Sequence, residues 1–387
     1  MAITYIIYNL ILISSTFFIF IAEKRKAKTE KIIYTFISFS IIFIPAAIRY
    51  NIGADYFSYV NIFNEIKFNS DNYNKEIGFY FLNKLLIYLD ADVQWLFVIT
   101  SFIIYSFVYA SYPYKNKALF HFIFITTFYL VSYNLVRTAI VYSISIYILS
   151  ILLFQKKNIF LILSFIIIAF LFHKSAILIL TIPLLYIIVP KRIFNFRSFS
   201  IICLISLVLF FLFRERILNI IFNLSIIKLL GYDKYIHSIY ASKVEYNSGI
   251  GIILSIVPFL IIIAFSKELN NENIKNNLII IGCFIYIFAI ICNSTFIIFS
   301  RVERLFIFII PLSLIVFLEC KKIHRIIRGC FLIYVIFWYT LSFEMNINIF
   351  RSTECAGSRI SPYVSIFNKE DDHSLKIVHS ECLKQER

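Results

Sequence analysis

The sequence is short of charged residues. Only 15% of its 387 residues are charged and 60% are apolar, whereas a soluble domain has about 25% charged residues. With a mean hydropathy of +0.85, this composition excludes a water-soluble protein and indicates that the lipid bilayer is its solvent. Because backbone polar groups must be paired in lipid, we expect an all-α, polytopic integral membrane protein.

Motifs that bind metals or nucleotides are also missing. The seven cysteines include no CxxC pair, and the eight glycines form neither a P-loop nor another glycine-rich phosphate loop. We therefore expect no metal and no cofactor. The net charge of +15 comes from short basic clusters scattered between apolar runs, a pattern that fits membrane topology better than nucleic-acid binding.

Long apolar runs predict about twelve transmembrane helices, because about 20 residues of helix cross a hydrocarbon core of about 30 Å. The run of residues 118–154 is too long for one span, and its polar stretch at 132–137 predicts a turn. Residues 159–189 are short for two spans and long for one, and His173-Lys174 at their middle favour a hairpin. The predicted spans are residues 2–22, 31–49, 93–112, 118–133, 138–154, 159–172, 175–189, 198–213, 250–266, 277–297, 303–318 and 329–343.

The distribution of lysine and arginine predicts the orientation in a bacterial inner membrane. When residues 23–31 are placed in the cytoplasm, the loops on that side carry most of the excess positive charge. The first span lacks a cleavage site and is expected to be retained, so both termini are periplasmic. We expect a single transmembrane domain over residues 1–343. The outward segments are the periplasmic loops 49–92 and 214–249 and a polar periplasmic tail, 344–387.

Two stretches of the outward loops are apolar but too short to span the membrane comfortably. Residues 78–89 and 217–230 are therefore expected to form interfacial or re-entrant helices. Asp90-Ala91-Asp92 has the DxD form of a metal site for nucleotide sugars, but its place before a predicted span favours a helix start. In the tail, Cys355 and Cys382 are able to form a disulfide if they lie close together in an oxidising compartment.

Polar residues gather at the start of the first outward loop, in Arg49 to Tyr59 (RYNIGADYFSY). One interpretation is an ordinary loop, in which Gly53 makes a turn, Arg49 reaches lipid headgroups and Asp55 caps the next helix. The other interpretation is an active-site segment. The sequence alone leaves both open.

Several cations lie near the outer ends of predicted spans, against the general inside bias. Guanidinium groups suit phosphate, because they donate paired hydrogen bonds. Contact with lipid headgroups explains any one of these cations equally well. His173 is a candidate proton acceptor, with a structural hydrogen-bonding role as the alternative. The cations are Arg49, Arg137, Lys174, Arg301 and Arg304.

The stretch from Arg49 to Tyr59 resembles the RxxxGxDYxxY signature of the EpsG family of membrane polysaccharide proteins, which includes Wzy-type O-antigen polymerases. Three shorter stretches fit the same family pattern: Glu76 to Phe79 resembles its ExG[FY] segment, Asn134 to Arg137 its NxxR, and His173 to Ala176 its HxS[AG]. Weaker similarities are Arg301, Arg304 and Pro362-Tyr363. The chain departs from the family at Thr138, where the family usually has Gln.

This resemblance implies an O-antigen or polysaccharide polymerase of the inner membrane with a periplasmic active site. Such a glycosyltransferase moves a growing glycan from undecaprenyl diphosphate onto a lipid-linked repeat unit, without a nucleotide sugar. The implied partners are the undecaprenyl-diphosphate-linked oligosaccharide, the bilayer, and a flippase and a chain-length regulator of the same pathway.

The resemblance also suggests a role for each candidate residue. The base that deprotonates the acceptor hydroxyl is expected to be Asp55, with His173 second and Glu76 third. Cations are expected to bind the lipid diphosphates and to stabilise the charge on the departing one. The diphosphate ligands are Arg49, Arg137, Arg301, Arg304 and Lys174, and the sugar-contacting residues are Tyr56, Tyr59 and Asn51.

Two other functional classes fit the composition. A lipid-linked oligosaccharide flippase or another transporter also has many spans and cations, although it favours symmetric halves and short outer loops. A membrane acyltransferase that modifies surface sugars is the third class, and it requires an acyl-donor site accessible from the cytoplasm. Loss of polymer length with retained single repeat units separates a polymerase from both.

Overall fold

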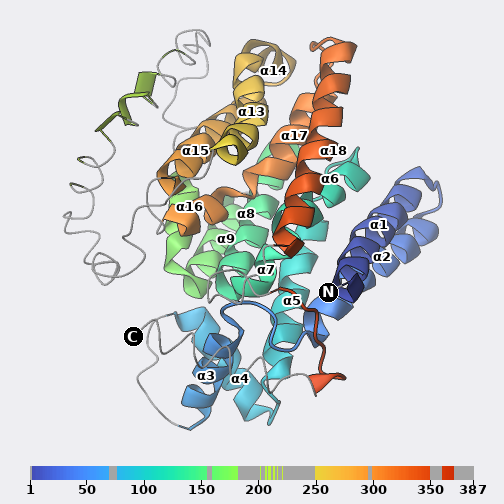
Figure 1. The fold of residues 1–387 in the computed structure, drawn as a ribbon, viewed down its shortest axis with the longest axis vertical. Helices are drawn as coiled ribbons and strands as arrows, with labels where there is room; N and C mark the ends of the chain where they lie inside the picture. Colours follow the sequence, from blue (N-terminus) through green and yellow to red (C-terminus); the bar gives the residue numbers. More distant parts are fainter. Residues whose placement is uncertain are drawn as a thin grey trace. The chain divides into compact units, whose positions relative to one another are not determined.

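The computed structural model of this chain, drawn in Figure 1, is helical throughout the part that it describes. Within that part, the one β-bridge joins Arg49 and Ser365, so the all-α prediction is confirmed. The described residues are 2–68, 76–154, 159–181, 249–294, 299–348 and 360–369, with isolated positions between 201 and 220.

Five helical segments in the described ranges are long and apolar enough to cross a membrane. A sixth results if α13 (Ile250–Ala264) and α14 (Ser266–Glu272), which meet at a bend of 55°, form one broken span. The protein is therefore membrane-embedded, but the predicted number of about twelve spans is not confirmed. The five segments are α1 (Ala2–Lys24), α2 (Lys28–Ile48), α8 (Val136–Phe154), Ile274–Asn293, which joins η5 (Ile274–Asn276) to α15 (Asn277–Asn293), and Arg325–Ile347 of α18 (Arg325–Asn348).

Several predicted spans differ in form from the expectation. The span predicted at 303–318 is divided between two shorter helices, α16 (Phe299–Phe306) and α17 (Ile309–Glu319). The spans predicted at 175–189 and 198–213, like the helix at 217–230, fall largely or wholly outside the described residues. Cys355 and Cys382 also lie outside them.

The contacts divide the chain into two compact units. The first comprises Met1–Ile151, Lys157–His173 and Phe337–Arg387. The second comprises Leu152–Lys156 and Lys174–Ile336. In the second unit, α15 packs against α13, α16 and α17, and buried Ile, Leu and Phe side chains of α15 and α17 form its core.

In the first unit, α1 and α2 form an antiparallel hairpin, visible as the paired blue helices of Figure 1. The hairpin packs through α2 on α5 (Gln94–Ala110) and through α1 on α6 (Lys117–Phe124). Buried polar side chains join these helices: Ser38 Oγ donates to the Ser15 carbonyl at 2.8 Å, and His121 Nε2 lies 2.9 Å from Ser15 Oγ. His121 therefore belongs to the scaffold.

The turn predicted at residues 132–137 is present. Helix α6 continues through the π-helix η1 (Ile125–Tyr129) and α7 (Val131–Asn134), and the chain breaks at Leu135 before α8. Stacked Phe128 and Tyr142 rings pack η1 against α8. At His173, where a hairpin was expected, α9 (Ile159–Phe172) ends and the 3₁₀ helix η2 (Lys174–Leu180) follows. Most of the second half of that hairpin lies outside the described residues, so the hairpin itself stays a prediction.

Two short helices lie in the predicted outward loop. These are α3 (Tyr56–Lys67) and α4 (Ile77–Tyr88), which pack together, and α4 also contacts α5 and α9. The helix predicted at 78–89 is thus confirmed as α4. Its Phe81, Leu85 and Tyr88 side chains are 64%, 53% and 86% exposed, an apolar face that suits a membrane surface. Asp92 lies two residues before α5, which agrees with the expected helix start, but the N-cap is Val93 and no side chain caps this helix: Asp92 Oδ1 accepts from the Val93 N–H instead.

Candidate active site

The segment that follows α2 is a tight loop pressed against α7. Gly53 has a φ of +105°, and a Cβ at this position would lie 2.5 Å from the Tyr133 carbonyl oxygen. Only glycine meets both demands, since it has no Cβ. The Ala54 N–H donates to Asn134 Oδ1 at 2.6 Å. The NxxR stretch therefore holds the loop of the first motif through its asparagine.

Asp55 stands directly before α3 and makes no side-chain capping bond there. Its backbone carbonyl accepts from the Tyr59 N–H at 3.1 Å, so Asp55 lies one helical turn from Tyr59. The carboxylate is half-buried. Its position at the edge of the loop keeps it among the candidates for chemistry.

Tyr56 and Tyr59, the two predicted sugar contacts among the three tyrosines of this motif, are buried. The Tyr56 ring stacks on Phe97 with 4.5 Å between centroids, and the Tyr59 ring packs edge-on against Phe79 at 5.7 Å. Burial raises the pKa of Tyr59 to about 12, although the charge of Arg137 opposes this shift. Tyr59 is therefore a neutral phenol near neutral pH. Asn51 is half-buried and has a φ of 52°.

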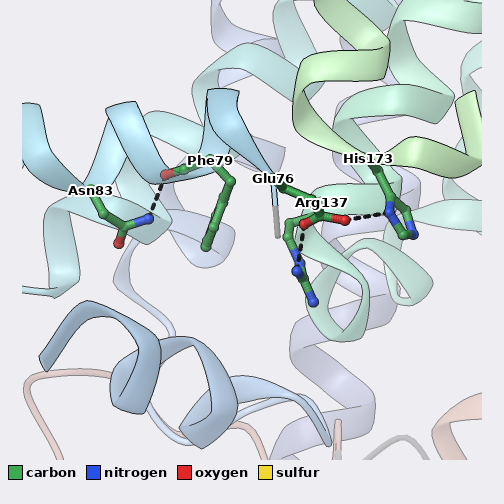
Figure 2. A network of polar contacts seen from close by, with 5 residues as sticks. All are labelled: Glu76, Phe79, Asn83, Arg137 and His173. Atoms are coloured by element: carbon green, nitrogen blue, oxygen red, sulfur yellow. Dashed lines mark hydrogen bonds and ion pairs between the residues drawn. The ribbon is translucent and has the colours of Figure 1, made fainter. Parts of the chain in front are cut away.

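Glu76, Arg137 and His173 form a cluster, shown in Figure 2, in which the Glu76 carboxylate pairs with the Arg137 guanidinium and contacts the His173 imidazole. Arg137 Nη1 lies 2.5 Å from Glu76 Oε2, and His173 Nδ1 lies 2.6 Å from Glu76 Oε1. Glu76 precedes α4, Arg137 lies in the first turn of α8, and His173 follows α9. Three stretches that are far apart in the sequence thus meet at one carboxylate, and each of its oxygens faces a different partner.

Close packing of α4 on the end of α9 brings the carboxylate to the imidazole. A Cβ at Gly78 would lie 3.0 Å from the Leu171 carbonyl carbon, closer than side chains normally allow. Gly78 therefore lets the backbone of α4 approach the backbone of Leu171. Gly78 lies two residues after Glu76, and Leu171 lies two residues before His173. The glycine of the ExG stretch thus allows the packing that brings the Glu76 carboxylate to the His173 imidazole.

The partners of Glu76 in this cluster favour its ionised form. Glu76 is 7% exposed, and burial alone raises the pKa of its carboxyl, but contact with His173 and the charge of Arg137 together outweigh burial and hold that pKa below its ordinary value. Glu76 is consequently ionised near neutral pH. The side chains of Arg137 and His173 are 27% and 26% exposed, so both remain reachable by a ligand.

Aromatic rings surround the guanidinium of Arg137. Its Cζ lies 5.6 Å from the ring centroids of both Tyr59 and Phe79. Such rings attract a cation with their electron-rich faces. The first motif, through Tyr59, thus reaches the same place as the other three.

Arg49 is enclosed, with 2% exposure. Its Cζ lies 4.8 Å from the Phe97 ring and 4.9 Å from the Tyr133 ring, and its Nη1 donates to the Ala46 carbonyl and to Ser101 Oγ. The interpretation that Arg49 reaches the lipid headgroups is wrong, because rings and helix backbone surround the guanidinium. A role for Arg49 in diphosphate binding stays a prediction.

The remaining candidates belong to the second unit. Lys174 is exposed at the start of η2, and α16 carries Arg301, which is exposed, and Arg304, which is half-buried. Between these arginines, Glu303 accepts a hydrogen bond from Asn293 Nδ2. Sequence reasoning missed this carboxylate, although its place between two predicted arginines was a usable signal.

The structural role of Asn134 was also not predicted from the sequence. In the NxxR stretch only Arg137 was a candidate, whereas Asn134 binds the backbone of the loop before Asp55. No three His, Cys, Asp or Glu side chains cluster as metal ligands anywhere in the described ranges.

Comparison with known proteins gives one clear match. The family model described as EpsG family matches residues 31–365, which is most of the chain. No curated protein and no solved structure matches significantly.

Proposed function

Because the chain belongs to the EpsG family, a family of Wzy-like polymerases, we propose that it is an O-antigen or related polysaccharide polymerase. Its substrates in this proposal are two lipid-linked glycans on undecaprenyl diphosphate at the periplasmic face. The observation that carries the proposal is the cluster of Glu76, Arg137 and His173, which unites three family-like stretches in one reachable place.

The proposed reaction is a glycosyl transfer. A hydroxyl oxygen of the new repeat unit attacks the anomeric carbon that links the growing chain to its lipid. The bond from that carbon to the diphosphate oxygen breaks, and undecaprenyl diphosphate leaves as an anion. The hydroxyl proton passes to a protein base, so the reaction requires one base and a cation that stabilises the departing diphosphate.

His173 is the base in this proposal, and Glu76 orients it. The Glu76 carboxylate faces Nδ1 of the imidazole at 2.6 Å, which leaves Nε2, on the far side of the ring, available for the acceptor hydroxyl. A carboxylate in this position also stabilises the imidazolium that forms. Glu76 itself is poorly suited as base, because its lowered pKa makes it a weak proton acceptor.

Arg137 is the proposed ligand of the departing diphosphate. One nitrogen of its planar guanidinium faces Glu76, and the side chain is still partly exposed. A guanidinium binds phosphate oxygens through paired hydrogen bonds. Lys174, Arg301 and Arg304 remain proposed ligands of the second diphosphate, and Asp55 remains the alternative base, with Tyr56, Tyr59 and Asn51 as proposed sugar contacts.

The test is polymerisation in a strain that lacks this protein, complemented with variants at matched levels. His173→Ala should leave lipopolysaccharide capped with single repeat units, because removing a general base costs about 10²- to 10⁴-fold. His324→Ala is the matched control, since this exposed histidine precedes α18 and is not part of the cluster. Long chains from His173→Ala would refute His173 as the base.

The same strain separates the alternative classes. Loss of a flippase leaves the lipid-linked repeat unit on the cytoplasmic side, where periplasmic glycan-labelling reagents do not reach it. Loss of a polymerase leaves that unit labelled at the periplasmic side and the surface glycan one unit long. Loss of an acyltransferase changes the acylation of full-length polymer.

A further inference from the structure

A segment of the predicted polar tail is docked on the end of α2. Within Ile360–Lys369, Ser365 forms an antiparallel bridge with Arg49. The Tyr50 N–H donates to the Val364 carbonyl at 2.9 Å, and the Ile366 N–H donates to the Ile48 carbonyl at 3.0 Å. We name Ile360–Lys369 the docked segment. It holds the backbone on both sides of Arg49.

Tyr363 anchors the docked segment to both helices of the first hairpin. Its N–H donates to Thr4 Oγ1 of α1 and its hydroxyl to the Pro45 carbonyl of α2, both at 2.9 Å. Its ring packs edge-on against Tyr8, with 5.9 Å between centroids, and the Tyr8 hydroxyl donates to the Ile360 carbonyl at 2.6 Å. Pro362-Tyr363, a weak family similarity in the sequence, thus has a structural task.

The docked segment completes the C-terminal cap of α2. The last four carbonyls of a helix have no partner within it, and in a buried place each needs one. In α2, whose C-cap is Arg49, these carbonyls belong to residues 46–49. Three accept from nearby side chains: the Ala46 carbonyl from Arg49, and the Ala47 and Arg49 carbonyls from Gln94. The fourth, that of Ile48, accepts from the Ile366 N–H of the docked segment, and the Tyr363 hydroxyl adds a hydrogen bond to the Pro45 carbonyl just before them.

This cap determines where the active-site loop begins. The docked segment holds the loop at Tyr50, and Asn134 holds it at Ala54, so both ends of a five-residue stretch are fixed. The next residue, Asp55, directly precedes α3, which carries Tyr59 to the guanidinium of Arg137. A continuous series of contacts thus connects the end of α2 with the surroundings of Arg137.

We propose that the docked segment is a positioning element of the active site: by capping α2 it fixes the Arg49–Asp55 loop, and through α3 it sets the surroundings of Arg137. This inference rests on the proposed function for its effect on polymerisation. The placement of the loop is measurable without it.

Two variants each remove one hydrogen bond between the docked segment and the end of α2. Tyr363→Phe deletes only the hydroxyl that donates to the Pro45 carbonyl and keeps the ring on Tyr8. Ile366→Pro deletes the N–H that donates to the Ile48 carbonyl. Phe367→Ala is the matched control within the docked segment, because this side chain is 81% exposed. We expect polymerisation to fall by about threefold in Tyr363→Phe and about tenfold in Ile366→Pro, as loss of one or more net hydrogen bonds implies.

The second measurement is independent of polymerisation. In full-length protein whose native cysteines are replaced, spin labels at Ser58 of α3 and Ile13 of α1 report the distance between the loop end and the first hairpin. Ile366→Pro should broaden this distance distribution in protein that is still folded, whereas Phe367→Ala should leave it narrow. A narrow distribution in both Tyr363→Phe and Ile366→Pro overturns the positioning role. If the unaltered protein fails to polymerise, the proposed function fails, and the distances still decide the positioning.

Discussion

Arg49 and Arg137 are both predicted to bind a lipid diphosphate, but their surroundings differ. Arg49 follows the C-terminal end of α2, is 2% exposed and donates to a carbonyl of that helix end. Arg137 stands in the first turn of α8, has 27% of its side chain exposed and pairs with Glu76. One guanidinium is enclosed by rings and backbone, and the other is partly exposed.

The helix ends explain the difference. A helix C-terminus carries partial negative charge, so it stabilises the Arg49 cation without a carboxylate. A helix N-terminus carries partial positive charge, so it disfavours Arg137, and Glu76 has to balance it. A cation held where the local backbone disfavours it, beside a buried carboxylate, is the arrangement expected of a functional residue. The comparison therefore favours Arg137 over Arg49 as the proposed ligand of the departing diphosphate, and diphosphate binding by Arg49 stays a prediction.

The largest effect that tests this comparison is expected at Arg137. Arg137→Met should lower polymerisation by about 10²- to 10³-fold, the usual loss when one group that stabilises developing charge is removed. The double variant Arg137→Met with Glu76→Gln removes both charges, leaves no unpaired buried carboxylate, and should fold and stay inactive. The measurement is the length distribution of the surface polymer.

Arg25 supplies the control for Arg137. It pairs with Glu30 at 3.6 Å, and both side chains are about half exposed, at 49% and 48%. Arg25→Met should therefore leave the polymer unchanged. Normal long chains from Arg137→Met would break the comparison, because Arg137 would then be no more functional than Arg25.

A smaller effect, on stability, is expected at Arg49. Arg49→Met removes the donors to the Ala46 carbonyl and Ser101 Oγ and leaves buried acceptors unpaired, which costs about 2–4 kcal/mol. The melting temperature in detergent and the amount of protein in the membrane should both fall. The double variant Arg137→Met with Glu76→Gln, which leaves no unpaired buried charge, should change either one less. A stable Arg49→Met protein that makes no polymer would instead group Arg49 with the diphosphate ligands.

The smallest effect concerns pH. The pKa of Glu76 is lowered in the folded protein, so its contacts with Arg137 and His173 contribute their full stability above the ordinary glutamate pKa of about 4.3 and lose it as the pH falls through the lower folded-state pKa. Thermal unfolding of the protein should show a decline in melting temperature over that acidic window. Glu76→Gln should flatten this part of the profile. Equal slopes for both proteins would mean that Glu76 is not held ionised by Arg137 and His173.

Much of the fold followed from the pattern of apolar residues. The turn at 132–137, the break at His173 and the short helix after residue 76 were all predictable, because polar residues interrupt apolar runs there. The division of the predicted span 303–318 into α16 and α17 was not predictable, since the apolar run continues through the break. Residues 344–387 read as a polar tail, and the pairing of Ser365 with Arg49 over more than 300 residues leaves no periodic trace.

By itself, the sequence determined the solvent of this protein, the helical class and the residue types available for chemistry, because hydropathy and side-chain type are local properties. Tertiary structure alone decided which of those residues meet. Glu76, Arg137 and His173 converge because Gly78 lets α4 approach α9, and Arg49 is enclosed because α2 ends among aromatic rings. The physical reason is that charge and hydrogen bonding act over a few ångströms in space, and distance along the chain says little about which groups come that close.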